Sequence, residues 1–246
     1  MSRKPTLSAS HISYQQHDRM IVKDVSIDIY PGEVVGLLGP NGAGKTTAFH
    51  LICGLLPCKN GKIRLADKDL TAHSLAIRAK AGLGFLAQER TLFPELTVNE
   101  NIMCALELKY ANKAQRQEKC DELQEKLSLT KVQSQKARSL SGGEARRAEL
   151  ARILATDPKI LLMDEPFAGV DPIAVTEIRE LIKQLTQLNI GVLITDHNAR
   201  EILTLCDRIA VIVEGKILTV GTQQEVLNHQ MVNTHYLNNE FSDLLV

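Results

Sequence analysis

Apolar and polar residues alternate in the first part of the chain in a way that predicts β-strands. Residues 25–29 carry apolar side chains at every second position, which is typical of a strand with one buried face. After a proline–glycine turn, residues 34–38 form a nearly continuous apolar run, as in a parallel strand buried on both faces. A glycine-rich stretch follows this run, and the pattern then predicts a helix over residues 47–56.

The middle of the chain changes character. Residues 97–155 contain almost no β-branched runs and many helix formers. Over residues 114–127, the side chains of Cys120, Leu123 and Leu127 fall on one face of a helix. We therefore predict a helical insertion in an α/β core.

Strands and helices alternate again in the last third. Apolar runs over residues 160–163 and 192–195 predict two more buried strands, and residues 209–213 and 216–220 predict a hairpin. Between the two buried strands, one helical face carries a row of core side chains: Ile178, Leu181, Ile182, Leu185 and Leu188.

Composition and charge exclude several classes of protein. The 29 lysines and arginines balance the 29 aspartates and glutamates, so the chain lacks the excess positive charge of a broadly basic nucleic-acid binder. No apolar run approaches the roughly 18 residues that span a bilayer, and the basic start continues into polar residues, unlike a signal peptide. We expect a soluble protein of the cytoplasmic side.

The cysteines support neither a zinc site nor a disulfide framework, because they are scattered, odd in number and never form a C-x-x-C pair. We expect free thiols that are buried as small apolar side chains. The five are Cys53, Cys58, Cys104, Cys120 and Cys206.

The glycine-rich stretch matches the phosphate-binding pattern G-x-x-x-x-G-K-[ST]. Its glycines let backbone N–H groups approach phosphate oxygens, Lys45 can neutralise the β- and γ-phosphates, and the Thr46 hydroxyl can ligate Mg²⁺. The predicted helix that follows would direct its positive N-terminus at the same anion. We expect nucleotide contacts from nine consecutive residues: Gly39, Pro40, Asn41, Gly42, Ala43, Gly44, Lys45, Thr46 and Thr47.

Two acids end the predicted strand over residues 160–163. If this strand lies beside the strand that precedes the phosphate-binding loop, Asp164 would reach Mg²⁺ through water. Glu165 would then orient or deprotonate an attacking water. Alone, two acids after a strand fit a helix cap equally well, but together with the loop they favour nucleotide hydrolysis.

The segment Leu-Ser-Gly-Gly-Glu, which begins at Leu140, has two interpretations. Ser141 and Glu144 form a capping box for a helix over residues 145–154, and this is a sufficient structural explanation. The two glycines between them also leave N–H groups free to bind a terminal phosphate.

The order of these motifs resembles that of the ATP-binding cassette (ABC) ATPases. A phosphate-binding loop, a single Gln88, the Leu-Ser-Gly-Gly-Glu signature, an apolar strand ending in Asp-Glu and a lone His197 follow one another along the chain. The resemblance covers residues 7–241, which is nearly the whole sequence.

The resemblance implies an α/β fold with a P-loop NTPase (RecA-like) core, an antiparallel β subdomain and an inserted α-helical subdomain. The chain would form a single domain over residues 1–246. Its core would occupy about residues 1–90 and 156–246, and the helical subdomain about residues 91–155.

The resemblance also implies roles for four residues outside the loop. Tyr14 would stack on adenine; the less favoured alternative is an ordinary strand tyrosine. Gln88 would sense Mg²⁺ and the γ-phosphate and would act, with Glu165 and His197, as a catalytic residue. His197 would contact the γ-phosphate, and Asp171 would cross the interface between two subunits.

In this family the signature of one subunit closes over ATP held by the phosphate-binding loop of another. This chain has one loop and one signature, Ser141, Gly142, Gly143 and Glu144. Two complete sites therefore require a second copy, in a head-to-tail pair with two-fold symmetry. ATP and Mg²⁺ are the implied cofactors.

Residues 164–172 and 194–198 look most like the ATPase subunit of lipopolysaccharide export, and Tyr236 and Phe241 fit that subunit's tail. This implies a protein on the cytoplasmic face of the inner membrane, where it powers lipopolysaccharide extraction with two integral membrane subunits and no nucleic acid. Leu92 and Phe93 would dock those subunits, unless Phe93 is a core residue. The residues expected to hold Mg²⁺ are Thr46, Gln88 and Asp164.

Three residues depart from the pattern of the export ATPases, and none of them is a catalytic group: Ala87, Pro94 and Ala145. The main alternative is the ATPase of a branched-chain amino-acid importer, which is similar in size and general sequence. A soluble cassette ATPase of DNA repair or translation fits less well, because this chain has a single cassette without a long coiled-coil insertion.

Overall fold

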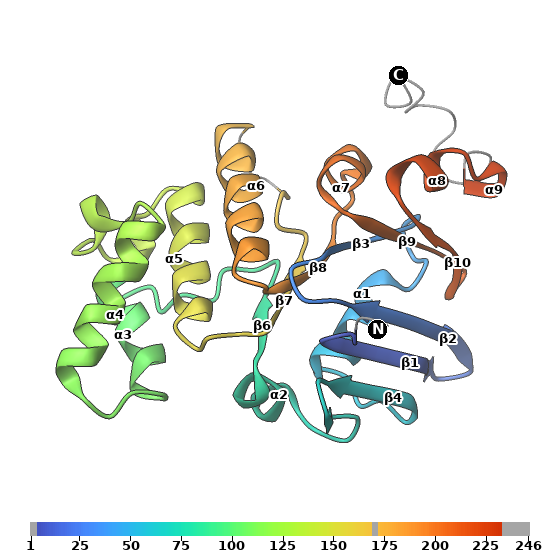
Figure 1. Ribbon diagram of the computed structural model, residues 1–246, viewed down its shortest axis with the longest axis horizontal. Coiled ribbons are helices and arrows are strands. Elements are labelled where there is room, and N and C mark those ends of the chain that lie inside the picture. Colours follow the sequence, from blue (N-terminus) through green and yellow to red (C-terminus); the bar gives the residue numbers. More distant parts are fainter. Residues whose placement is uncertain (1–3, 169–171, 233–246) are drawn as a thin grey trace.

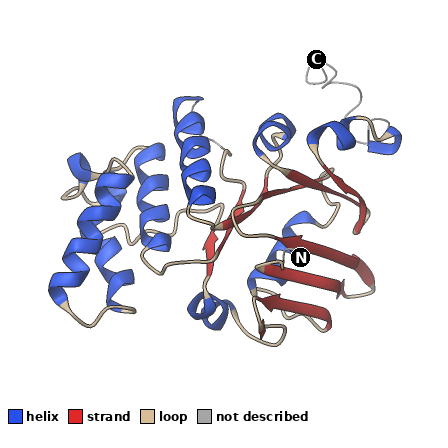
Figure 2. Cartoon of the chain, in the orientation of Figure 1, coloured by secondary structure: helices blue, strands red, loops and turns tan. Residues whose placement is uncertain are grey.

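The computed structural model describes residues 4–168 and 172–232. It contains a six-stranded and a four-stranded sheet, with most of the helices packed around the larger one (Figures 1 and 2). The six-stranded sheet, in spatial order, consists of β10 (Lys216–Gly221), β9 (Arg208–Val213), β3 (Val34–Leu38), β8 (Gly191–Thr195), β7 (Ile160–Asp164) and β6 (Leu83–Leu86). The four-stranded sheet consists of β2 (Arg19–Ile29), β1 (Leu7–Gln16), β4 (Asn60–Leu65) and β5 (Lys68–Asp69).

The five strands from β9 to β6 run parallel, and β10 closes one edge as the antiparallel half of the predicted hairpin. Every residue of β3, β7 and β8 is buried, as their apolar runs predict for strands covered on both faces. The expectation that the strand ending in Asp164 lies directly beside the strand before the phosphate-binding loop is wrong, because β8 lies between β7 and β3. Asp164 nevertheless pairs with Thr195 at the end of β8, and Thr195 pairs with Leu37 of β3.

The helices follow in chain order, and two short 3₁₀ turns separate α4 from α5. They are α1 (Lys45–Cys53), α2 (Leu75–Ala81), α3 (Val98–Glu107), α4 (Lys113–Lys126), η1 (Thr130–Val132), η2 (Ala137–Ser139), α5 (Gly142–Leu154), α6 (Pro172–Gln187), α7 (Ala199–Leu205), α8 (Gln223–Leu227) and α9 (Gln230–Val232).

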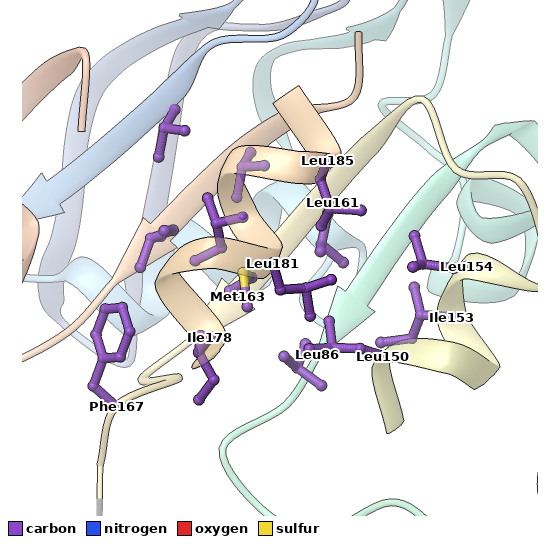
Figure 3. Packing of buried hydrophobic residues seen from close by; sticks show 14 of the residues in the cluster. Leu86, Leu150, Ile153, Leu154, Leu161, Met163, Phe167, Ile178, Leu181 and Leu185 are labelled. Atoms are coloured by element: carbon purple, nitrogen blue, oxygen red, sulfur yellow. The ribbon is translucent and has the colours of Figure 1, made fainter. Parts of the chain in front are cut away.

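Two hydrophobic clusters lie on the two faces of the parallel sheet. On β3, Val35 and Leu37 belong to the cluster with α1 and the antiparallel sheet, whereas Val34 and Leu38 belong to the cluster with the other helices. Figure 3 shows the second cluster, in which α6 packs over Leu161 and Met163 of β7, with α5 beside it. The ends of the central strands are therefore held rigidly from both sides.

Helices α3, α4 and α5 pack on one another beyond the β6 edge of the sheet (Figure 1). Capping boxes of Thr97 with Glu100 and of Ser141 with Glu144 begin α3 and α5. These three helices confirm the predicted change of character in the middle of the chain.

Three local predictions are wrong. Helix α1 begins two residues earlier and ends three residues earlier than predicted, because Gly44 and Gly54 both adopt the left-handed conformation at its ends. Leu188 follows the last residue of α6 and is 54 % exposed, so it does not belong to the core face. Cys104 is exposed, whereas the other four thiols are free and buried.

Within the described ranges, no helix combines the length and apolar character that crossing a membrane requires.

Candidate nucleotide site

The phosphate-binding loop connects β3 to α1 at the carboxyl end of the parallel sheet, where ligands commonly bind in α/β folds. Gly39 is required sterically, because a Cβ atom there would lie 2.1 Å from the carbonyl oxygen of Ile212. Gly44, at φ 103°, lets the chain turn into α1. The loop is therefore shaped by backbone demands that only glycine meets.

Lys45 is buried in the loop, and its Nζ donates to the carbonyl oxygens of Gly39 at 2.6 Å and Pro40 at 3.1 Å. Burial lowers the pKa of Lys45, and the negative charge of Glu165 partly opposes this effect. The ammonium group thus has neutral hydrogen-bond acceptors and incomplete charge compensation. Such a group favours a nearby anion such as phosphate.

The second half of the site is acidic. Asp164 ends β7 and is 6 % exposed, and burial together with the charge of Glu165 raises its pKa to about 6. His50 of α1 places Nε2 3.8 Å from Asp164 Oδ2. A buried carboxylate with a raised pKa gains from a cation that neutralises it.

These groups fit Mg²⁺ bound together with a nucleotide. Asp164 offers carboxylate oxygens, and Thr46, at the start of α1, offers a hydroxyl. Among the described residues, no group of three or more histidine, cysteine or acidic side chains is arranged so that it could hold a metal ion by itself. Mg²⁺ is typically held by one or two carboxylates, water and the phosphates of its substrate, so this small donor set suits it.

The side chains of the other two residues predicted as catalytic lie close to the Glu165 carboxylate. Gln88 Nε2 donates to Glu165 Oε2 at 2.7 Å, and His197 Nδ1 lies 3.9 Å from the same oxygen. Glu165 itself has φ 45°, a left-handed conformation that is rare for residues other than glycine and costs free energy. Its N–H donates to the Thr195 carbonyl at 2.7 Å, which anchors this turn to β8.

Asp196, which the sequence did not single out, fixes the segments on both sides of this cluster. Its fully buried carboxylate accepts hydrogen bonds from the N–H of Phe167 at 3.0 Å and of Asn198 at 2.9 Å. His197 Nδ1 lies 3.5 Å from Asp196 Oδ1. Asp196 therefore ties the segment after Glu165 to the turn that carries His197.

Arg146 and Glu149 could not be identified from the sequence as residues that support the site, because nothing in their spacing shows what they contact. Arg146 Nη1 donates to the Ala87 carbonyl at 2.7 Å and lies 3.1 Å from Glu149 Oε2. Both side chains are buried in α5. They hold the backbone next to Gln88 against the helix that carries the signature.

A hollow of about 400 Å³ lies beside the phosphate-binding loop. It is lined by loop residues 40–43, by side chains of β2 and by the turn between β9 and β10. Tyr14 is not among its lining residues: it lies on β1 opposite Val22, half-buried against the core. The sequence missed the β2 residues at this hollow, which are Arg19, Met20, Ile21 and Lys23.

The structure does not join the signature to the phosphate-binding loop of the same chain. Ser141 is exposed at the start of α5, and no hydrogen bond or ion pair in the described part of the chain links residues 141–144 to residues 39–47. A Cβ atom on Gly143 would lie 3.2 Å from Ala174 Cβ of α6, so the signature packs beside α6. Asp171, Tyr236 and Phe241 lie outside the described residues.

The residues predicted to dock a partner lie just after Gln88. Phe93 is 53 % exposed, with the Arg152 guanidinium 5.7 Å from the centre of its ring, whereas Leu92 packs against the larger hydrophobic cluster. The alternative that Phe93 is a core residue is therefore wrong.

Comparison with known proteins identifies the class to which this arrangement belongs. The sequence pattern of the ABC transporter family matches residues 22–168, and the chain belongs to this family. The chain is 46 % identical to the lipopolysaccharide export system ATP-binding protein LptB of Acidithiobacillus ferridurans, over 96 % of this chain and 98 % of that protein. The Escherichia coli K12 protein of the same name is 43 % identical over the same shares of the two chains.

Solved structures agree with the fold. An ATP-binding cassette of an ABC transporter, in its ADP conformation, superposes with a TM-score of 0.84 at 27 % identity and covers 95 % of this chain and 99 % of its own. A dimeric cassette in a post-hydrolysis state with ADP and phosphate gives 0.77 at 25 % identity, over 88 % of this chain and 98 % of its own. The chain is an ABC-type ATPase with a P-loop NTPase fold, and ABC ATPases work as dimers.

Proposed function

We propose that this ATPase lies at the cytoplasmic face of the inner membrane, where it powers extraction of lipopolysaccharide from that membrane and its export toward the outer membrane. The observation that carries the choice of cargo is the similarity to lipopolysaccharide export ATPases, at 43 to 46 % identity over 96 % of the chain. A branched-chain amino-acid importer remains the alternative from sequence, and no feature of the site favours it.

In the proposed mechanism, Lys45 turns from the Gly39 and Pro40 carbonyls to the β- and γ-phosphates of ATP. This change of hydrogen-bond partner is favoured because the charge of the buried ammonium group is incompletely compensated. Thr46 and Asp164 would hold Mg²⁺, which supplies charge neutralisation at the phosphates. The backbone N–H groups of the loop and of α1 bind the remaining phosphate oxygens.

Glu165 is the proposed general base. Its Oε2 takes a proton from water while the water oxygen forms a bond to the γ-phosphorus and the bond to the ADP oxygen breaks. The amide of Gln88, 2.7 Å from this oxygen, orients the carboxylate and the water, and His197 contacts the γ-phosphate. The buried Asp196 keeps the His197 turn in position.

We infer that two copies enclose two ATP molecules. The Ser141 N–H donates to Glu144, but Gly142 and Gly143 after it offer N–H groups at the start of α5 that have no phosphate in their own chain to bind. A second copy, placed head to tail, would bring these groups to the γ-phosphate held by Lys45, with Asp171 at the interface and Tyr14 at the adenine.

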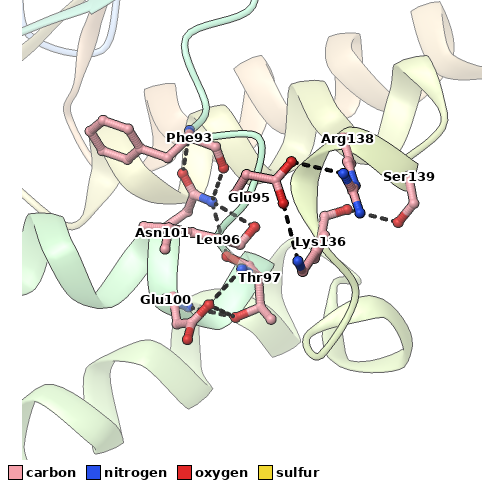
Figure 4. A network of polar contacts seen from close by, with 9 residues as sticks. All are labelled: Phe93, Glu95, Leu96, Thr97, Glu100, Asn101, Lys136, Arg138 and Ser139. Carbon is pink, nitrogen blue, oxygen red and sulfur yellow. Dashed lines mark hydrogen bonds and ion pairs between the residues drawn. The ribbon is translucent and has the colours of Figure 1, made fainter.

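Leu92 and Phe93 are the proposed contact with two integral membrane subunits. The exposed aromatic ring of Phe93 (Figure 4), five residues after Gln88, suits a partner-binding anchor, because such rings often dominate the free energy of association. The packing of α3, α4 and α5 on one another supports a helical subdomain of about residues 91–155. The rest, about residues 1–90 and 156–246, would be the core of a single domain.

Purification from membranes tests this proposal most directly. The tagged chain is extracted with a mild detergent from a strain that lacks the untagged copy, and the co-purified proteins are identified by mass spectrometry. We expect two integral membrane subunits and ATPase activity that responds to added lipopolysaccharide. Substrate-binding and membrane components of an amino-acid importer in the same preparation would overturn the choice of cargo.

A further inference from the structure

His197, the residue proposed to contact the γ-phosphate, lies in the turn that leads into α7. Its side chain is 61 % exposed, so packing around the ring does not fix its position. Helix α7 has seven residues and begins at Ala199, and the Asn198 side chain caps it by accepting the Glu201 N–H at 3.3 Å. The position of the His197 turn therefore depends on how α7 is held.

The apolar face of α7 packs on the parallel sheet. Ala199, Ile202 and Leu203 are buried, and they belong to the same hydrophobic cluster as Ile178 and Leu181 of α6. The two helices therefore cover the same face of the sheet (Figure 1). Apolar contacts are non-directional, so the orientation of α7 about its own axis also depends on the polar contacts of its other face.

Arg179 of α6 makes these polar contacts. Its Nη2 donates to Thr204 Oγ1 at 2.6 Å, and its Nε lies 3.4 Å from Glu201 Oε2. Because Glu201 and Thr204 are three residues apart, they are neighbours on one side of α7. One planar guanidinium therefore holds α7 at two points, which restricts rotation of the helix.

Glu201 depends on this contact for compensation of its charge. Its side chain is 18 % exposed, and its Oε2 is buried without a hydrogen bond in the described part of the chain. The guanidinium of Arg179 lies close enough to offset the cost of burying this oxygen. Removing one partner of such a pair is unfavourable, because the other charge then stays buried without compensation.

A second support holds the same turn from the side of the sheet. Asp196 accepts the Asn198 N–H at 2.9 Å and also binds the backbone of Phe167. Arg179 takes no part in these bonds, since its contacts are with the side chains of α7. The segment with His197 is therefore held by the backbone on one side and through α7 on the other.

We propose that Arg179 is a positioning residue for ATP hydrolysis. By binding Glu201 and Thr204, it orients α7 so that His197 stays 3.9 Å from the Glu165 carboxylate and within reach of the γ-phosphate. The role in hydrolysis rests on the proposed function of His197, whereas the connection between α6 and α7 does not.

The connection is tested in the isolated chain by amide hydrogen exchange. Arg179→Met keeps the aliphatic stem and removes the guanidinium. The N–H groups of Glu201 and Ile202 should then exchange about three- to tenfold faster, as expected for loss of a charge-assisted contact that solvent partly screens. Lys183→Met, which removes an ion pair with Glu180 within α6, is the matched control and should leave both amides unchanged. Equal exchange in Arg179→Met and the native chain would overturn the proposal.

Hydrolysis should change while nucleotide binding does not, because Arg179 contacts α7 and not the phosphate-binding loop. Arg179→Met should lower kcat about three- to tenfold and leave the affinity for ATP, titrated without Mg²⁺, unchanged. Thr204→Val removes the neutral acceptor but keeps the charge of Glu201 paired, so it should lower kcat less. Lys183→Met should keep the native kcat. Loss of ATP affinity in Arg179→Met, in parallel with kcat, would contradict a positioning role.

A double-mutant comparison decides whether Arg179 acts through His197. His197→Ala should slow single-turnover phosphate release, and adding Arg179→Met should then slow it by less than about twofold. A further loss as large as that in the native background would overturn the proposal, because Arg179 would act through another group. If His197→Ala alone hydrolyses ATP at the native rate, the proposed function of His197 fails together with the role of Arg179 in hydrolysis. Hydrogen exchange then still tests the connection between the two helices.

Discussion

Lys45 illustrates how one side chain is prepared for its ligand. Its ammonium group is buried and donates to two neutral carbonyl oxygens, and burial lowers its pKa. Among the described residues, Glu165 is the only acid whose charge raises this pKa, so the positive charge is incompletely compensated. A phosphate that replaces the two carbonyls would supply a charged acceptor, which makes a stronger hydrogen bond than a neutral one.

Lys45→Ala should weaken ATP binding about ten- to a hundredfold, because one charge-assisted contact to phosphate is lost. Isothermal titration of the purified variant with ATP measures this change. Unchanged affinity would show that the loop does not hold the phosphates through Lys45.

Asp164 should make stability depend on pH in an uncommon direction. Its folded pKa is about 6, against 3.8 in its ordinary state, so the folded chain binds this proton more tightly than the unfolded chain does. The contribution of Asp164 to stability is therefore lost as the pH rises from about 4 to about 6, and it stays lost above that range.

Without Mg²⁺ and nucleotide, Asp164→Asn should raise the free energy of unfolding by on the order of 2 kcal/mol near neutral pH, and the gain should vanish near pH 4. Urea titrations of both proteins across this range measure the difference. Mg²⁺ and ATP should then stabilise the native chain more than the variant. A variant that is less stable at neutral pH would contradict this account.

The sequence predicted the residues whose chemistry is local. The loop from Gly39 to Thr47 and the pair Asp164–Glu165 follow from spacing and residue type, and the structure brings Gln88, Glu165 and His197 together. Asp196 and Asn101 could not be found in this way. Asp196 binds a backbone group that tertiary folding brings to it, and Asn101 binds backbone groups that the path of one loop, residues 93–97, brings to it (Figure 4). Neither residue lies in a sequence pattern that indicates these contacts.

At the scale of elements, strands and helix starts were more predictable than their neighbours in space. Buried strands and capping boxes depend on residues within one short segment, and the structure contains them. The expectation that β7 lies beside β3 was wrong, because the crossovers between parallel strands decide which strands pair and place β8 between these two. The early end of α1 follows from a single left-handed Gly54.

The segment after Gln88 carries Phe93, the proposed contact with a partner. Phe93→Ala should fold and bind ATP normally, because the ring is 53 % exposed and touches no predicted phosphate contact. It should weaken association with the membrane subunits about thirtyfold, corresponding to about 2 kcal/mol for an aromatic anchor. Co-purification against the native chain measures this loss. Normal assembly would place the docking contact elsewhere, with Leu92 as the next candidate.

At the scale of the whole molecule, the two motifs that we propose to form one ATP site lie apart within a single chain. The phosphate-binding loop lies with Glu165 at the end of the parallel sheet, and Ser141 begins α5 beside α6. The central claim is that two copies close over ATP and that Glu165 then permits hydrolysis and release. If ATP binds between the two copies as proposed, it should stabilise the closed pair by linkage.

The most direct test is the mass of purified Glu165→Gln in solution, measured with and without Mg²⁺ and ATP, together with phosphate release. The substitution removes the proposed base while Asp164 and Lys45 remain, so ATP should bind but turnover should stop. We predict a stable dimer that retains two unhydrolysed ATP molecules, whereas the native chain should hydrolyse ATP and separate again. Phosphate release at the native rate, or a variant that stays monomeric at saturating ATP, would contradict the account.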